Sequence, residues 1–166
     1  MPAPEPLIRL RERLLVLAGK LAWLGPLLAR VTVGVVFLQT GWGKLHDLDK
    51  VTSFFTELNI PAPAFQARLV AGTELIGGAL LLVGLLSRLA ALPLAFSMTI
   101  AIVTARRGDI TGLAALLGLE EWTYVVLFVW IALAGPGPVS LDRAFAPFWT
   151  RRASQPPPAR DTMRAP

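Results

Sequence analysis

Long apolar stretches almost free of charge constrain this chain more than any other feature. They lie at about residues 27–45, 69–86, 89–105 and 122–134. A bilayer offers backbone groups no hydrogen-bond partners, so a stretch of this length crosses it as a helix, which pairs those groups internally. The sequence therefore predicts an all-α integral membrane four-helix bundle. Several stretches are near the short end of the usual ~17–25 residues, so we expect a compact, tilted bundle or a locally thinned bilayer.

Composition agrees with a membrane location and excludes several kinds of site. Hydrophobic residues make up 54% of the chain and charged residues 16%, against about 25% charged residues in a soluble domain. The net charge is +5, and the basic residues lie at the ends of the apolar stretches and in the tails. The expected partner is therefore the lipid bilayer and not nucleic acid. Without cysteine, and with His46 as its one histidine, the chain is expected to hold no metal, haem or iron–sulfur cluster.

Two segments outside the apolar stretches are expected to form interfacial helices. In residues 1–26, leucines recur at helical spacing from Leu7 onward, which predicts an amphipathic helix on the membrane surface or, alternatively, packed on the end of the bundle. Between spans one and two, apolar residues again recur at helical spacing, with Asp47 as the expected N-cap and Asn59 followed by Pro61 as the stop. The sequence thus divides into residues 1–26, a transmembrane domain at 27–142, and an interfacial segment with a disordered Pro/Arg-rich tail at 143–166.

Basic residues predict the orientation of the bundle. Of the 16 Lys and Arg residues, eleven fall on the side that holds the N-terminus, Arg88 and the C-terminus, and five fall on the other side. Basic residues accumulate on the cytoplasmic side of membrane proteins. We therefore expect both termini in the cytoplasm.

Glu74 is the residue in the apolar stretches that most strongly suggests function. A charged group at the centre of a membrane helix costs on the order of 2.5–3.5 kcal/mol on insertion scales, so it is either paired for structural reasons or kept for a ligand or proton. Both interpretations stay open. Counting inward from the helix ends places Gln39 and Thr99 at the depth of Glu74, with Lys44 and Tyr124 slightly nearer the outer surface. These five residues are the candidate ligand-binding set, and Lys44 is the expected counter-ion.

Several short motifs, in a fixed order, resemble the DoxX family of small bacterial membrane proteins. The resemblance runs from Arg30 to Asp142. Its pieces are Arg30, Gln39–Leu45, Asn59–Pro61, Glu74–Gly78, Gly84–Arg88, Gly135–Gly137 and Ser140–Asp142.

The resemblance implies a four-helix bundle in the bacterial inner membrane and a link to membrane redox chemistry. Some members are quinone-reactive subunits of a thiosulfate-oxidising system, and others associate with proteins of oxidative-stress defence. The expected function is thus a membrane subunit of a quinone-linked redox or oxidative-stress system, acting with a soluble or membrane redox partner. One alternative is a non-enzymatic anchor or assembly subunit that recruits soluble redox proteins. A small-solute transporter is a further alternative, although the inner halves of the helices look too apolar for a polar path.

Overall fold

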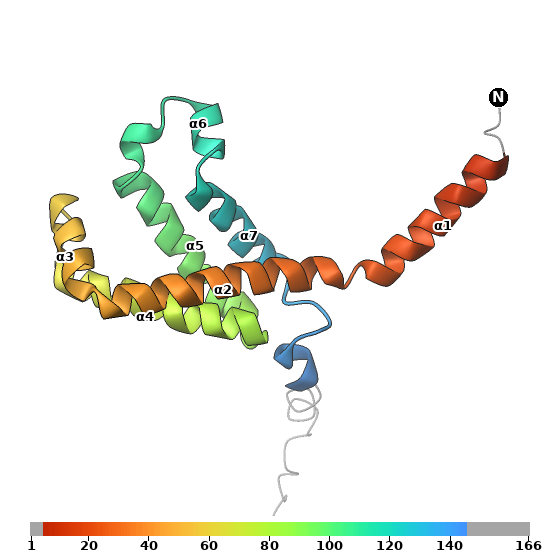
Figure 1. Ribbon diagram of the computed structural model, residues 1–166, viewed down its shortest axis with the longest axis horizontal. Helices are drawn as coiled ribbons and strands as arrows, with labels where there is room; N and C mark the ends of the chain where they lie inside the picture. Colours follow the sequence, from red (N-terminus) through yellow and green to blue (C-terminus); the bar gives the residue numbers. More distant parts are fainter. Residues whose placement is uncertain (1–4, 146–166) are drawn as a thin grey trace, which may run out of the picture.

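A computed structural model of the protein describes residues 5–145, and the described part consists of helices and the loops that connect them, without β-strands (Figure 1). The predicted tail at 143–166 lies almost entirely outside the described residues. The helices in chain order are α1 (Glu5–Leu21), α2 (Leu24–His46), α3 (Leu48–Glu57), α4 (Pro63–Val83), α5 (Ser87–Thr104), the 3-10 turn η1 (Arg107–Asp109), α6 (Leu113–Leu117) and α7 (Glu120–Ala134).

Three of these helices are long and apolar enough to cross a membrane. They are α2 with 23 residues, α4 with 21 and α5 with 18. They coincide with the first three expected spans, which confirms an all-helical membrane protein. The fourth expected span corresponds to α7, which has 15 residues and is only about 22 Å long. It is shorter than a perpendicular span requires, so a full crossing by α7 stays a prediction.

The bundle core is made by α2, α4, α5 and α7 together. Within it α2 packs chiefly on α4, and α5 chiefly on α7, so that the second pair leans away from the first on the side of α3 (Figure 1). Phe37 of α2 and Phe128 of α7 join the pairs, with ring centroids 4.8 Å apart in an edge-to-face arrangement. The buried apolar residues of this core are Val33, Phe37, Leu81, Ala90, Ala91, Leu94, Met98, Phe128 and Ile131.

Helix α4 begins six residues earlier than the hydropathy pattern predicts. Ala62 adopts a left-handed conformation (φ 51°) and Pro63 occupies the first helical turn, where its fixed φ fits a helix and its missing N–H would be unpaired anyway. Glu74 therefore lies about 16 Å from the start of its helix, deeper than an apolar stretch that begins at residue 69 suggests. The expected N-cap of α3 is confirmed, since the Asp47 carboxylate accepts a hydrogen bond from Lys50 N at 3.3 Å.

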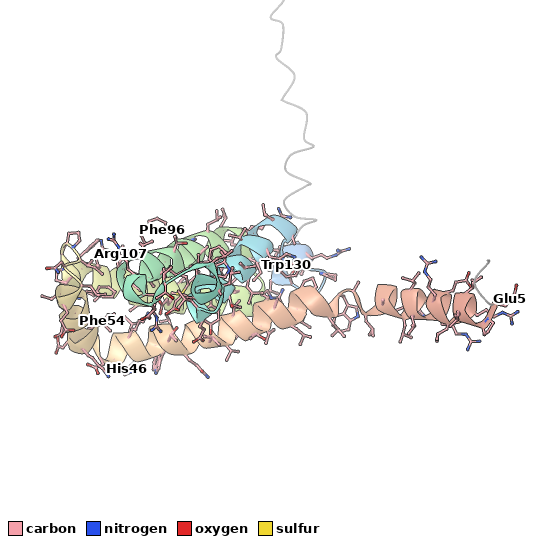
Figure 2. The ribbon with its side chains drawn as sticks, turned by 90° about the horizontal axis from the view of Figure 1, so that it is seen from above. Glu5, His46, Phe54, Phe96, Arg107 and Trp130 are labelled. Atoms are coloured by element: carbon pink, nitrogen blue, oxygen red, sulfur yellow. The ribbon has the colours of Figure 1, made fainter. Side chains whose placement is uncertain are left out.

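Helix α1 contacts little of the bundle. None of its residues is buried, and it projects beyond the bundle from the start of α2, with Glu5 at one end of the molecule and His46 at the other (Figure 2). The alternative in which α1 packs on the end of the bundle is therefore wrong. Its leucines are exposed, and only two residues separate its end from the start of the first spanning helix. A position on the membrane surface stays a prediction for this helix.

Candidate functional site

Glu74 of α4 and Lys44 of α2 form an ion pair inside the bundle. Lys44 Nζ donates to Glu74 Oε1 at 2.5 Å. The Glu74 side chain is 1% exposed, whereas that of Lys44 is 32% exposed. The structure thus confirms that Glu74 faces the interior and that Lys44 is its partner. A carboxyl group in a dry environment requires a polar partner, and the Lys44 side chain supplies one.

Close contact between the backbones of α2 and α4 brings the two charges together. A Cβ added to Gly41, one turn before Lys44, would collide with the backbone of Leu75. A Cβ on Gly78, one turn after Glu74, would collide with Leu38 N. Small residues allow membrane helices to approach in this way. Gly41 and Gly78 therefore allow the two helices to pack closely, and they also bring Lys44 within reach of the carboxylate.

The second carboxylate oxygen of Glu74 has no partner within the described residues. Oε2 is buried and accepts no hydrogen bond there. Buried polar atoms are normally satisfied, and an exception in a native site is often explained by an unseen ligand, water or ion. Lys44 meanwhile keeps N–H donors beyond the one used by Oε1. Side by side, the two residues offer one free acceptor and further donors.

A large apolar cleft lies over this ion pair, between α3, α4 and α5. Its volume is about 900 Å³, and both Lys44 and Glu74 line it. Most of its wall is hydrophobic, including Phe54, Leu69 and Phe96, and these three side chains are also exposed at the surface of the bundle. Figure 2 shows Phe54 and Phe96 on separate helices, α3 and α5. The cleft combines an apolar wall with a few polar groups, which is the usual character of a small-molecule site.

The other three candidates do not join the ion pair. Gln39 is exposed on α2. Thr99 is also exposed, and its hydroxyl donates to Ala95 O of its own helix at 2.8 Å. Tyr124 donates its hydroxyl hydrogen bond to Glu120, and none of the three lines the cleft. A role for them in ligand binding stays a prediction, without support from their placement.

A second polar cluster, at the opposite end of the bundle, was not anticipated. Arg30 of α2 is buried, and its Nη1 donates to Pro136 O at 3.0 Å. The Asp142 carboxylate accepts from Leu86 N at 2.6 Å and from Ser87 N at 3.0 Å, and so caps α5. The segment after α7 thereby returns to the α4–α5 turn and the start of α2.

A sequence signal for this cluster exists. Helix α5 begins with backbone N–H groups that need acceptors, and Ser87 does not cap the helix itself. Asp142 is an acidic residue shortly after the Gly-Pro-Gly turn that ends α7. A search for a carboxylate that could cap the start of α5 would have included Asp142 as a candidate. The distance between the two along the chain gives no reason to prefer Asp142 over other acidic residues.

The segment between α5 and α7 carries a third charged group, at the surface near the cleft end. Arg106 Nε donates to Glu121 at 2.8 Å, and Arg106 also pairs with Asp109 at 3.5 Å. The hydrogen bond to Glu121 raises the pKa of Arg106 above its ordinary value. The cluster links the end of α5 to the start of α7, and it does not line the cleft.

Comparison with known proteins identifies relatives over most of the transmembrane region. A family model described as DoxX matches residues 25–107. No solved structure matches the chain significantly. The match includes both residues of the ion pair.

Three curated relatives extend this likeness. A Bacillus subtilis protein named "Putative oxidoreductase CatD" is 31% identical over 121 residues, which cover 72% of this chain and 85% of the relative. A Mycobacterium tuberculosis protein named "Uncharacterized membrane protein Rv3486" is 34% identical, over 69% of this chain and 77% of the relative. "Inner membrane protein YqjF" of Escherichia coli is 29% identical, over 78% of this chain and 98% of the relative.

Proposed function

The chain belongs to the DoxX family, and from this premise we propose that it is the membrane subunit of a quinone-linked redox system in the bacterial inner membrane. The quinone head lies in the cleft at Lys44 and Glu74. One relative carries the name of an oxidoreductase and another that of an inner membrane protein, which supports this assignment. A redox partner, soluble or membrane-bound, exchanges electrons with the bound quinone.

The unpartnered Oε2 of Glu74 beside Lys44, in an apolar cleft, is the observation that carries the proposal. A quinone accepts electrons and protons, and its oxygens are hydrogen-bond acceptors when oxidised and donors when reduced. Lys44 offers donors to a carbonyl oxygen, and Glu74 Oε2 offers an acceptor to a hydroxyl. Exposed apolar side chains in the wall, such as Leu69 and Phe96, open the cleft toward the hydrocarbon of the bilayer, where quinones dissolve.

The need for a partner follows from the composition of the chain. It contains no cysteine, so it cannot collect electrons through a dithiol of its own. The proposed role of this subunit is to hold the head, orient it between Lys44 and Glu74, and keep bulk water away from it.

A small-solute transporter is disfavoured by the core. Phe37, Leu81, Leu94 and Phe128 are buried between the level of Glu74 and the level of Arg30. They leave no continuous polar path between these levels within the described bundle. A non-enzymatic anchor is favoured by one observation, the exposure of the whole of α1, and this function would not require the ion pair.

The orientation of the bundle also remains a proposal. The start of α2, the α4–α5 turn and residues 136–142 meet at one end, on the side to which the sequence pattern assigns eleven of the 16 Lys and Arg residues. We place this end and both termini in the cytoplasm. The cleft then opens in the outer half of the membrane.

Purification in a mild detergent, followed by mass spectrometry of extracted lipids, tests the quinone proposal. The wild-type protein is expected to retain quinone, and Glu74→Gln is expected to lose it, because the acceptor is replaced by a neutral amide. Glu57→Gln is the matched control, since Glu57 is exposed on α3 and lies outside the cleft. Absence of quinone from the folded wild-type protein, or equal retention by both variants, would overturn the proposal. Pathway activity that survives Glu74→Gln, but not removal of residues 5–21, would favour the anchor.

A further inference from the structure

A second hollow continues from the cleft along the seam between α4 and α5. Its volume is about 460 Å³, and it shares Leu69, Thr73 and Pro93 with the cleft. It runs past Gly72 toward Leu80 of α4 and Leu86 at the α4–α5 turn. From Leu69 to Leu80 the distance along the helix axis is about 16 Å. We call this hollow the seam groove.

Polarity changes from one end of the combined cavity to the other. At the cleft end lie the charged pair and the buried, unpartnered Oε2 of Glu74. Arg68 also lines the groove near this end. Beyond Thr73 the lining is apolar, with Ile76, Leu80 and Leu89 among its residues. A molecule that matches this cavity is polar at one end and a hydrocarbon over the rest of its length.

We propose that the ligand of this protein is a single-tailed amphiphile whose hydrocarbon tail lies in the seam groove and points toward the α4–α5 turn. The inference rests on the proposed function in placing the head at Lys44 and Glu74. It adds the class of ligand, which excludes small water-soluble quinols and other untailed solutes as natural occupants. It also fixes the direction in which the ligand lies along the bundle.

The groove directs the tail and adds little to affinity. A tail that leaves lipid for the groove exchanges one hydrocarbon environment for another, so no hydrophobic gain accompanies the move. Contact with fixed side chains on two helices instead gives the tail one path. The informative measurement is therefore the position of the tail, and not a dissociation constant.

Photolabelling in lipid nanodiscs measures this position. One pair of probes is a naphthoquinone with a long alkyl tail that carries a diazirine close to the head or at the far end. A long-chain alcohol with the same two diazirine positions forms a second pair, which cannot undergo quinone chemistry. The near-head diazirine is expected to label residues around Thr73 and Met98. The far diazirine is expected to label residues around Leu80, Leu86 and Leu89.

A matched pair of glycine variants identifies the groove as the cause of this pattern. A Cβ at Gly72 meets no atom within 4 Å, and Gly72 lines the groove, so Gly72→Leu places an apolar side chain in the groove without a backbone clash at its Cβ. It is expected to abolish labelling at the far end and to leave near-head labelling unchanged. Gly25→Leu, also in open space but distant from the groove, is expected to change neither.

Annular lipid would produce a different result. Probes that act only as annular lipid label exposed residues outside the groove, such as Val35 and Leu133, as strongly as the groove, and their labelling pattern does not respond to Gly72→Leu. That result with both probe pairs would overturn the inference. If the far diazirine of the alcohol probes labels the groove in a way that Gly72→Leu abolishes, and that of the quinone probes does not, the tail path stands and the quinone assignment fails.

Discussion

Glu74 and Lys44 form an ion pair whose members differ in burial, because the carboxylate is enclosed by the bundle while the ammonium group reaches the cleft. The pair crosses the contact between α2 and α4. Since the two residues offer free hydrogen-bonding capacity on the side of the cleft, the same interaction can serve both packing and ligand binding.

Removal of one charge separates these two roles. Glu74→Gln leaves Lys44 without its counter-ion and is expected to cost on the order of 1–2 kcal/mol of stability, less than the ~3–5 kcal/mol of a fully buried pair because Lys44 is partly exposed. Adding Lys44→Met is expected to recover part of this loss, and thermal unfolding in detergent measures both. If binding is the function of the pair, the double variant stays unable to retain quinone. Recovery of quinone retention by the double variant would leave the pair a structural role only.

The close contact between α2 and α4 predicts a strong effect of single methyl groups. A Cβ at Gly34 would lie 2.8 Å from Leu82 N, which cannot move without displacing the helix. Gly34→Ala is expected to destabilise the bundle by about 1–3 kcal/mol through overpacking, seen as a lower melting temperature and less monodisperse protein. Gly25→Ala is the control, because the same methyl group would meet open space. Equal behaviour of the two variants would contradict the observed helix contact.

The cap on α5 predicts that a substitution far along the chain destabilises the start of that helix. Asp142→Ala removes the acceptor of two backbone N–H groups and is expected to cost about 0.5–2 kcal/mol. Proteolysis should become faster at the α4–α5 turn as well as at residue 142. Asp49→Ala, an exposed carboxylate on α3, serves for comparison, and a loss no larger than that of this variant would count against the cap.

Orientation can be measured directly because the native chain lacks cysteine. Ser53→Cys on α3 and Val139→Cys after α7 both introduce an exposed thiol, at opposite ends of the bundle. In intact cells an impermeant maleimide is expected to label position 53 and to label position 139 only after lysis. Labelling in the reverse order would show that the termini face outward. Ser87 is unsuitable for this purpose because it is buried.

The surface cluster at Arg106 predicts a small, salt-dependent effect. Its side chain remains 46% exposed, and exposed ion pairs contribute little to stability. Arg106→Gln is expected to lower the melting temperature slightly at low ionic strength and by less at high salt, as followed by thermal unfolding. A larger loss that salt does not reduce would point to a buried structural role for this side chain.

The spanning helices and the ion pair could be predicted because both depend on local rules. Hydropathy located the spans, and counting residues from the helix ends placed Lys44 within reach of Glu74. The early start of α4 could not be predicted from hydropathy, because the left-handed Ala62 and the first-turn Pro63 determine it. The alignment of Gln39 and Thr99 by depth failed as a guide to contact, because equal depth does not specify which face of a helix a residue occupies.

Long-range docking was the part least accessible from sequence. Nothing in the spacing of Arg30 and Pro136 indicates that they meet, since the local sequence around each residue accounts for its own helix or turn without the other. The periodicity of α3 predicted a helix, but not that Phe54 and Val51 would line a cleft. Such contacts depend on the relative placement of whole helices, which hydropathy does not encode.

The bond between Arg30 and Pro136 also sets an order of events during biosynthesis. Arg30 leaves the ribosome more than a hundred residues before Pro136, and Leu86 precedes Asp142 by 56 residues. Until then the guanidinium group and the first backbone N–H groups of α5 need other hydrogen-bond partners, from water or from the insertion machinery. Residues near the end of the described chain therefore complete an end of the bundle whose other residues were made much earlier, and a nascent chain interrupted before Pro136 has a charged, uncapped end there.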